Sequence, residues 1–261
     1  MNRIPDKSVD LIICDLPYAK LKHMKWDVMI PFDKLWEQYN RICKDNAAVL
    51  LFGVEPFTSL IVTSNLANYR QKLTWLKKIP TNVMNAKKQF MNWTEDIIVF
   101  YRKLPVFHPQ MVFTNHKPVK QIYSKVNISG KGVFGKNGQK ETYTSYNNGY
   151  VYPKSVIQVD EITKGYLNKN KKYYHPTQKP VDLIRYLIRT YSNPGDIVLD
   201  NCMGSGTTAI AAMREQRNFI GFELDPDFFE TCQRRLADEK SFVETEKKKR
   251  EDRPFTVNPL F

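Results

Sequence analysis

The chain has 261 residues, with 40 lysines and arginines against 27 acidic residues and a formal net charge of +13 at pH 7. This length suits one large α/β domain that carries an inserted subdomain. It contains no run of 18 uncharged apolar residues, no signal peptide and no arginine-rich presequence, so we expect a soluble, cytoplasmic protein without membrane contact. The four cysteines lack a CxxC spacing and the four histidines form no HExxH pair, which argues against a metal site or a disulfide framework.

The first predicted strand is the apolar run 9–14, which contains several β-branched residues. Pro17 cannot donate to a β ladder and biases Leu16 to extended geometry, so the strand ends at Asp15 and a loop begins. A carboxylate and the aromatic Tyr18 then stand at the carboxyl end of a strand, where α/β folds place ligands. A packed tyrosine beside a strand-ending aspartate is an equally good interpretation of these residues in isolation.

Two helices and three strands are predicted next, from the spacing of their apolar residues. The helices are 31–43 and 55–65, and the strands are 47–52, 73–78 and 96–101. Residues 80–94 are polar and mixed, which predicts a loop between the last two strands.

Residues 102–179 are strongly basic, with 14 lysines and arginines, three acidic residues and a net charge of +11, whereas the rest of the chain carries +2. They also hold eight of the 14 tyrosines and six of the 11 glycines. Periodicity is weak from 104 to 170, and a long irregular segment inside a compact domain is usually functional. Basic side chains with interleaved aromatics are typical of a polyanion-binding surface, and nucleic acid is the partner we predict for it.

A helical pattern returns at 180–191, and a strand at 197–199 then leads into Asp200 and a glycine-rich turn. Gly204 and Gly206 carry no Cβ, so the backbone can approach a ligand closely there. The expected N-cap of the following helix is Ser205 or Thr207. An ordinary turn between a strand and a helix is the simpler interpretation.

The next predicted strand, 219–222, ends in Glu223, 23 residues after Asp200. An acidic residue in this position is where α/β folds hold ribose hydroxyls. No lysine follows Gly206, so a phosphate-binding loop would lack its cation. A cofactor with a ribose and without a phosphate therefore fits better. A helix is predicted over 226–246, and a charged tail follows.

Three motifs stand in one order along the chain: DLPY at 15–18, HPTQKP at 175–180 and DNCMGSGTT at 200–208. Together they resemble the DNA amino-methyltransferases, in the circularly permuted group whose catalytic tetrapeptide precedes the cofactor motif. The resemblance covers nearly the whole chain and implies a doubly wound, mostly parallel, seven-stranded Rossmann-like sheet. It implies a catalytic half at 1–103, an inserted basic target-recognition region at 104–172, a cofactor-binding half at 173–246 and a charged tail at 247–261.

The resemblance implies S-adenosylmethionine as the cofactor, and no metal. The implied cofactor-binding residues are Asp200, Met203, Gly204, Ser205, Gly206, Thr207, Glu223, His175, Thr177, Gln178 and Lys179. Glu223 is expected to hold the ribose hydroxyls. Thr177, Gln178 and Lys179 are expected to contact the methionine end of the cofactor. Met203 stands where the family more often has phenylalanine, which weakens the expected contact with the adenine ring.

The implied catalytic residues are Asp15, Leu16, Pro17 and Tyr18, and Leu16 replaces the first proline of the family's tetrapeptide. Asp15 and the carbonyl of Leu16 would receive the N–H donors of the target amino group, and Tyr18 would stack on a base rotated out of the duplex. Two acceptors favour a tetrahedral nitrogen whose lone pair points at the methyl donor, so catalysis rests on orientation and electrostatics. Cys14 precedes the tetrapeptide instead of lying within a Pro-Cys motif, which argues against cytosine C5 methylation.

The predicted function is methylation of an exocyclic amino group in DNA, with adenine N6 first because an aspartate opens the tetrapeptide. Cytosine N4 is the alternative target. A nucleic-acid-binding subunit that kept the fold but lost turnover is a second alternative, and methylation of a protein glutamine, which needs no basic insertion, is a third. The resemblance implies double-stranded DNA as the partner in a bacterial or phage context, with a homodimer and a cognate restriction endonuclease as further candidate partners.

Overall fold

The computed structural model describes residues 1–18, 27–113, 120–126, 140–146, 150–158 and 178–251. The chain forms two compact units, one made of Met1–His108 with Ser155–Phe261 and the other of Pro109–Lys154. The second unit spans fewer residues than the recognition region predicted at 104–172. At its carboxyl-terminal side, Val156–Ile157 forms a strand of the main sheet and so belongs to the first unit.

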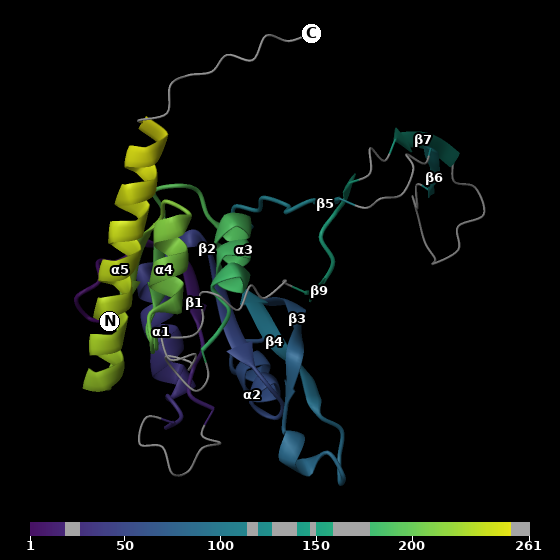
Figure 1. Ribbon diagram of the computed structural model, residues 1–261. Coiled ribbons are helices and arrows are strands. Elements are labelled where there is room, and N and C mark those ends of the chain that lie inside the picture. The colour runs from purple at the N-terminus through teal and green to yellow at the C-terminus, as the bar shows by residue number, and fades with distance from the viewer. Residues whose placement is uncertain (19–26, 114–119, 127–139, 147–149, 159–177, 252–261) are drawn as a thin grey trace. The chain divides into compact units, whose positions relative to one another are not determined.

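The first unit is a seven-stranded sheet with helices on both of its faces (Figure 1). Its strands are β1 Val9–Cys14, β2 Cys43–Gly53, β3 Tyr69–Thr81, β4 Asn92–Phe100, β9 Val156–Ile157, β10 Ile197–Asp200 and β11 Asn218–Gly221. Its helices are α1 Phe32–Ile42, α2 Phe57–Ser64, α3 Val181–Tyr191, α4 Thr207–Arg214 and α5 Pro226–Glu251, with a 3₁₀ turn, η1, at Val83–Asn85. In the second unit β5 Val112–Phe113 pairs with β8 Tyr150–Val151, and β6 Lys120–Val126 pairs with β7 Lys140–Tyr146, both antiparallel.

The strand order of the large sheet is β11-β10-β1-β2-β4-β3-β9. Only β4 runs against its neighbours, and the other adjacent strands of this sheet are parallel. The mostly parallel, seven-stranded α/β sheet predicted from the sequence is therefore confirmed. Its central strands are buried on both faces, which is why they form continuous apolar runs in the sequence.

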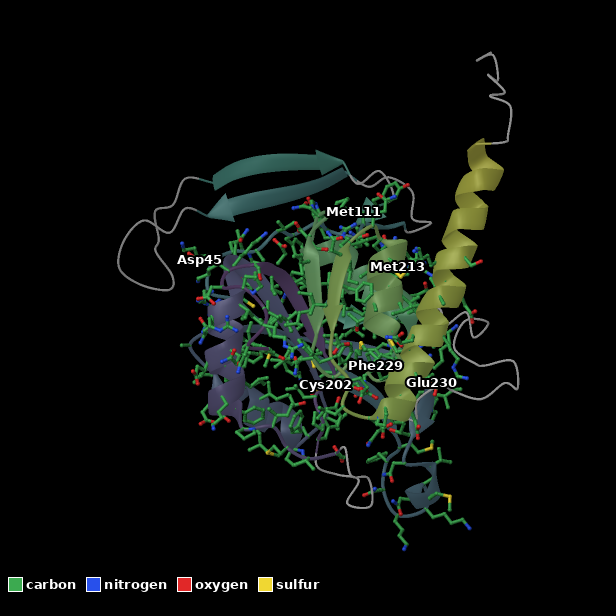
Figure 2. The ribbon with its side chains drawn as sticks, turned by 90° about the vertical axis from the view of Figure 1, so that its left-hand side faces the viewer. Asp45, Met111, Cys202, Met213, Phe229 and Glu230 are labelled. Carbon is green, nitrogen blue, oxygen red and sulfur yellow. The ribbon has the colours of Figure 1, made fainter. Side chains whose placement is uncertain are left out.

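Two apolar clusters hold the layers together, one on each face of the sheet. On one face Ile184 of α3 and Ile210 of α4 belong to the same buried cluster as Leu11 of β1. On the other face Tyr39 of α1 and Phe57 of α2 share a cluster with residues of β1 and β2. Figure 2 shows side chains filling the space between helices and sheet. Burial on both faces is what a doubly wound fold requires.

The hairpin of β3 and β4 is longer than predicted. The expected strands 73–78 and 96–101 become Tyr69–Thr81 and Asn92–Phe100, so the predicted loop 80–94 is wrong at both of its ends. The pairing of β2 with β4 ends at Gly53 opposite Asp96. Beyond that point β4 pairs only with β3 among the described residues. Many residues of both strands are exposed there, so the sequence lacks the continuous apolar run of a strand buried on both faces.

Helix α5 continues to Glu251, five residues into the charged tail predicted from 247 onward. It is also the longest helix of the described part of the chain. Among the residues that the structure describes, no helix is both long enough and apolar enough to cross a membrane.

Candidate active site

Those predicted site residues that the structure describes gather at one edge of the sheet, where the parallel strands end. β1 ends directly before Asp15, β10 ends at Asp200, and β11 ends two residues before Glu223. These strands are adjacent and parallel, so their carboxyl ends lie together. β4 runs the other way, and its first residues, including Glu95, therefore reach the same edge.

Asp15 has both carboxylate oxygens bound by donors of the protein. The Tyr18 hydroxyl donates to Oδ1 at 2.6 Å, and Lys179 Nζ donates to Oδ2 at 2.6 Å. Burial raises the pKa of Asp15; the charge of Lys179 opposes this rise and that of Glu95 adds to it. The next residue, Leu16, is buried in the core and Pro17 is half-buried, so the backbone after Asp15 is anchored.

Lys179 belongs to a group of four alternating charges, which we call the charge quartet: Asp15, Lys179, Glu95 and Lys77. Lys179 Nζ lies 3.2 Å from Glu95 Oε2, and Lys77 Nζ lies 3.2 Å from Glu95 Oε1. The side chains of Lys179 and Lys77 are only 9% and 6% exposed. Burial lowers the pKa of Lys179, but the two carboxylates outweigh it and raise that pKa overall. Burial likewise raises the pKa of Glu95, and the two lysines outweigh it, so the pKa falls.

The end of the HPTQKP motif joins the tetrapeptide to the glycine-rich turn. The resemblance implied that Lys179 contacts the methionine end of the cofactor, whereas its ammonium lies on Asp15 and Glu95. Gln178 accepts a hydrogen bond from Ser205 Oγ at 3.3 Å, in the glycine-rich turn. Of the other residues that the resemblance implied in this motif, His175 and Thr177 lie outside the described residues.

Tyr18 packs against the protein as well as binding Asp15. Its ring centroid lies 4.8 Å from that of Phe57, and the Lys179 ammonium lies 6.0 Å from the Tyr18 ring. Burial raises the pKa of Tyr18 well above its usual value, and the charge of Asp15 adds to the effect, so the phenol stays a donor. The packed tyrosine beside an aspartate is thus present, and stacking of Tyr18 on a base stays a prediction.

Asp200 faces the donors of its own turn. It is buried, and it accepts hydrogen bonds from Thr208 Oγ1 at 2.6 Å and from the Cys202 backbone N–H at 3.1 Å. Burial raises the pKa of Asp200 to about 6, while these two donors oppose the rise. Asp200 therefore fixes the glycine-rich turn to the first turn of α4, which positions the backbone around Gly204.

The cap of α4 differs from the prediction. Its N-cap is Gly206, with a φ of 81° and no side-chain cap, so a cap by Ser205 or Thr207 is wrong. Ser205 is instead buried under α5, where Arg235 donates to its carbonyl at 2.6 Å and to its hydroxyl at 2.8 Å. Thr207 is already the first residue of the helix. A Cβ at position 206 would overlap the sulfur of Cys232, so glycine is required by packing as well as by its backbone conformation.

Met203 and Glu223 link the glycine-rich turn to the end of β11. Met203 is buried, its backbone N–H donates to Phe222, and its sulfur lies where a Cβ of Gly221 would be. Glu223 Oε2 accepts from the Gly204 backbone N–H at 2.8 Å, and its Oε1 accepts from the backbone N–H of residue 225 at 2.9 Å. In Figure 2 the labels of Phe229 and Glu230 mark the first turns of α5, which begins directly after this loop.

Sequence patterns missed four residues that shape the site: Lys77, Glu95, Cys232 and Arg235. Lys77 lies inside the strand predicted at 73–78 and Glu95 directly before the strand predicted at 96–101, and only the pairing of β3 with β4 brings them together. The one signal in the sequence that could have indicated them was a charged residue within or next to an apolar strand. Cys232 and Arg235 lie on α5, and nothing in the sequence indicates which turn they cover.

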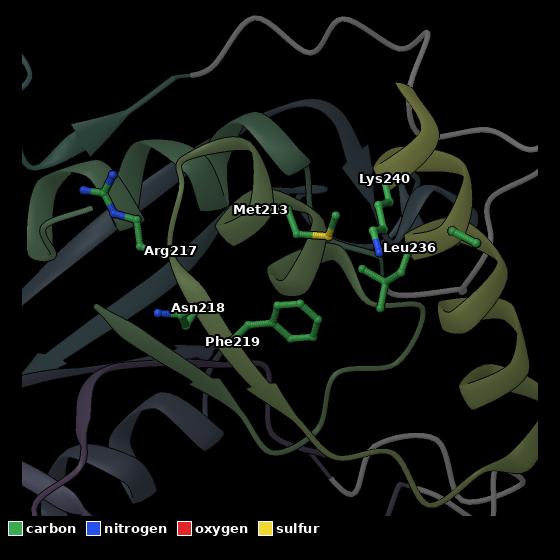
Figure 3. A pocket seen from close by; sticks show the side chains of 7 residues that line it. Met213, Arg217, Asn218, Phe219, Leu236 and Lys240 are labelled. Carbon is green, nitrogen blue, oxygen red and sulfur yellow. The ribbon is translucent and has the colours of Figure 1, made fainter. Parts of the chain in front are cut away.

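A pocket between α4, β11 and α5 lies away from this edge (Figure 3). It is lined by Met213 of α4, Arg217 directly before β11, Phe219 of β11, and Leu236 and Lys240 of α5. Arg217 and Phe219 stand at the start of β11, which is the end opposite to Glu223. The pocket is therefore not part of the candidate site. Within the described ranges, no three His, Cys, Asp or Glu side chains gather as metal ligands.

A doubly wound sheet, an acidic residue at the carboxyl end of each of three neighbouring strands and a glycine-rich turn between two of them define a Rossmann-like methyltransferase fold. The sequence model of the N6/N4 DNA methylase family matches residues 9–234, and the chain belongs to this family. The resemblance to DNA amino-methyltransferases is thereby confirmed.

Relatives and solved structures agree with this assignment. The chain is 32% identical over 244 residues to type II methyltransferase M1.MboII of Moraxella bovis, covering 87% of this chain and 89% of the relative. It is 28% identical over 249 residues to DNA adenine methyltransferase YhdJ of Escherichia coli strain K12, covering 90% and 79%. The structure of M1.HpyAVI in complex with SAM matches with a TM-score of 0.54 at 25% identity, covering 88% and 89%. The cytosine-N4-specific PvuII DNA methyltransferase shares the fold, with a TM-score of 0.59 at 15% identity, covering 93% and 86%.

Proposed function

We propose that this protein transfers a methyl group from S-adenosylmethionine to an exocyclic amino group of double-stranded DNA, at adenine N6. The observation that carries the proposal is the anchored carboxylate of Asp15 beside the glycine-rich turn, at the edge where both substrates would meet. An aspartate at the head of the tetrapeptide supports adenine, as does the likeness to a relative named a DNA adenine methyltransferase. Cytosine N4 is the alternative target, and mass spectrometry of the methylated nucleoside distinguishes the two.

The residues at the cofactor side fit S-adenosylmethionine. Glu223 offers a carboxylate for two ribose hydroxyls, and the adjoining Leu224 is 98% exposed, which leaves an apolar face for an adenine ring. Gly204 and Gly206, both at positive φ, bring the backbone close to the same place. When bound, this cofactor supplies a methyl group on a positively charged sulfur, which keeps the electron pair of the broken C–S bond as the C–N bond forms.

Asp15 and the Leu16 carbonyl orient the target amino group by accepting its two N–H donors. An amino N–H would replace the Tyr18 hydroxyl on Asp15 Oδ1, which frees the tyrosine ring to meet the base. The nitrogen becomes positive as it takes the methyl group, and a carboxylate in a partly buried site stabilises that charge strongly. The nitrogen then loses one proton, and Asp15 is the base positioned to take it.

The tip of the β3–β4 hairpin, residues 78–93, supports DNA as the substrate. It contains Lys78, Lys87 and Lys88 and no acidic residue. Met84 and Phe90 are 98% and 97% exposed, and the tip lies at the same edge of the sheet as Asp15 (Figure 1). Lysines bind phosphates, and apolar side chains inserted between base steps help proteins to open a duplex.

Replacing Lys87 and Lys88 with glutamine is expected to weaken DNA binding about equally for all sequences, because phosphate contacts carry no sequence information directly. Each lost phosphate contact reduces the slope of log affinity against log salt by about 0.9, so the double variant flattens it by about 1.8. Fluorescence anisotropy with labelled duplexes at several salt concentrations measures this slope. The matched control replaces Lys7 and Lys44, which pair with Asp45 and Asp10 at the opposite edge of the sheet. Equal slopes for the two double variants would indicate that the hairpin tip does not bind DNA and that the basic segment 102–179 does.

The homodimer, the cognate restriction endonuclease and the cytoplasmic location stay predictions from the resemblance. The domain boundaries at 103, 172 and 246 and the assigned roles of the site residues are likewise part of this proposal.

A further inference from the structure

We propose that Glu95, held in place by Lys77, is a positioning residue for methyl transfer: it shares the ammonium of Lys179 with Asp15 and keeps Asp15 a strong hydrogen-bond acceptor. This inference rests on the function proposed above, since it concerns the carboxylate assigned to the target amino group. Neither Glu95 nor Lys77 belongs to the three motifs that carry the family resemblance.

The Lys179 ammonium is confined between two carboxylates. It lies 2.6 Å from Asp15 Oδ2 and 3.2 Å from Glu95 Oε2. The Phe52 ring lies 5.1 Å from the same nitrogen, and the Tyr18 ring 6.0 Å from it. Because the ammonium is almost fully buried, water contributes little screening and the two ion pairs act strongly on each other.

Glu95 is itself fixed from the far side. Lys77 Nζ lies 3.2 Å from Glu95 Oε1 and donates to Thr81 Oγ1 at 3.1 Å. The quartet therefore has two positive and two negative members and no net charge. This balance allows four ionisable groups to be buried together, since an unpaired member would bear the full cost of desolvation.

The sharing of Lys179 matters for the chemistry. An ammonium bound to Asp15 alone would hold Oδ2 tightly and withdraw charge from the oxygen that accepts the target amino group. Glu95 neutralises part of that ammonium's positive charge, so Asp15 stays oriented by Lys179 and remains a strong hydrogen-bond acceptor. Burial raises the pKa of Asp15, Lys179 lowers it and Glu95 raises it further.

The groups that face Asp15 come from four segments. They are Tyr18 and Cys14 of its own segment, Glu95 of β4, Lys179 before α3 and Asp200 at the end of β10. Of these, Glu95 and Lys179 act on the pKa of Asp15 in opposite directions. Neutralising Glu95 is therefore expected to lower the pKa of Asp15, and replacing Lys179 with methionine is expected to raise it.

The chain offers a matched control in Asp96, the next residue of β4. Its side chain is 13% exposed, against 15% for Glu95. Asp96 also pairs with a lysine of β3, since Lys72 Nζ lies 3.3 Å from it, and it accepts from Thr58 Oγ1 at 2.9 Å. It has no contact with Lys179 among the interactions of the described residues.

The test compares Glu95→Gln with Asp96→Asn in a methyl-transfer assay with radiolabelled S-adenosylmethionine and unmethylated genomic DNA. For Glu95→Gln we expect kcat to fall about tenfold, with the cofactor Kd and the KM for DNA within about twofold of the parent. The acidic limb of the kcat profile should move to lower pH, and Lys179→Met should move it to higher pH. Asp96→Asn should match the parent in all of these. Equal kcat and equal pH profiles for Glu95→Gln and Asp96→Asn would overturn the proposal.

A second variant separates positioning from folding. Glu95→Gln combined with Lys77→Met removes one charge of each sign, so it should recover the melting temperature lost in the single variant while kcat stays low. Recovery of kcat in the double variant would show that Glu95 is structural. A carboxyl NMR titration of Asp15 gives a readout that needs no activity: Glu95→Gln should lower its pKa, and an unchanged pKa would also overturn the proposal. A parent protein without methyl transfer would refute the proposed function, and the titration would still decide the charge sharing.

Discussion

Replacing Asp15 with alanine should lower the rate of methyl transfer about 10²–10³-fold, or about 3–4 kcal/mol, with the affinity for S-adenosylmethionine nearly unchanged. In the proposed mechanism this carboxylate accepts the target amino group and stabilises its developing charge. Among the described residues its hydrogen bonds are to Tyr18 and Lys179, and none is to the glycine-rich turn. Single-turnover rates at saturating DNA and calorimetric titration of the cofactor measure the two quantities separately. Asp45→Asn, a change to an exposed carboxylate at the opposite edge of the sheet (Figure 2), is the control.

Loss of Asp15 also leaves Lys179 with Glu95 as its remaining ion-pair partner among the described residues, so the melting temperature of the variant must be compared with that of the parent. Equal losses of cofactor affinity and turnover would contradict the role assigned to Asp15. A variant that stays folded, binds the cofactor and transfers no methyl group is the outcome the site predicts.

Replacing Glu223 with alanine should do the reverse. Removing a charge-assisted hydrogen bond to the ribose costs roughly 1.5–3 kcal/mol of cofactor affinity, which is a rise in Kd of about 10–150-fold. The chemical step does not involve this carboxylate, so saturating cofactor should restore most of kcat. Calorimetry and initial rates over a wide range of cofactor concentration check both parts.

Glu223 also accepts from the Gly204 N–H and from the N–H of residue 225, and alanine removes both hydrogen bonds. Glu223→Gln keeps the shape and one acceptor oxygen, so it should retain more stability than alanine while still losing affinity. If saturating cofactor rescued neither variant, Glu223 would be a structural link between the glycine-rich turn and α5.

The central strands could be predicted from the sequence because they are buried on both faces. The runs that became β1 and β10 are short, apolar and bounded by an acidic residue and a turn. The acidic residues at the carboxyl ends of β1, β10 and β11 were therefore located, and with them the edge of the sheet that holds the candidate site. The glycine-rich turn was also located correctly, although the reason for Gly206 lies partly in Cys232 of α5.

The partner of Asp15 could not be predicted, because it depends on contacts between distant segments. Lys179 was expected at the cofactor, and its contact with Asp15 spans 164 residues of the chain. Glu95 joins the site only because β4 runs antiparallel and pairs with β3. Charged residues at the ends of strands look like solvent-facing residues in the sequence, and only the register shows that they neutralise one another in a buried group.

The most direct test of the proposed function is the identity of the methylated nucleoside. DNA without prior methylation is incubated with the protein and S-adenosylmethionine that carries an isotopic label in its methyl group, then digested to nucleosides for mass spectrometry. The site predicts labelled N6-methyladenine with the parent protein and none with Asp15→Ala. Labelled N4-methylcytosine would contradict the adenine assignment, and the absence of any labelled nucleoside would contradict the proposed reaction itself.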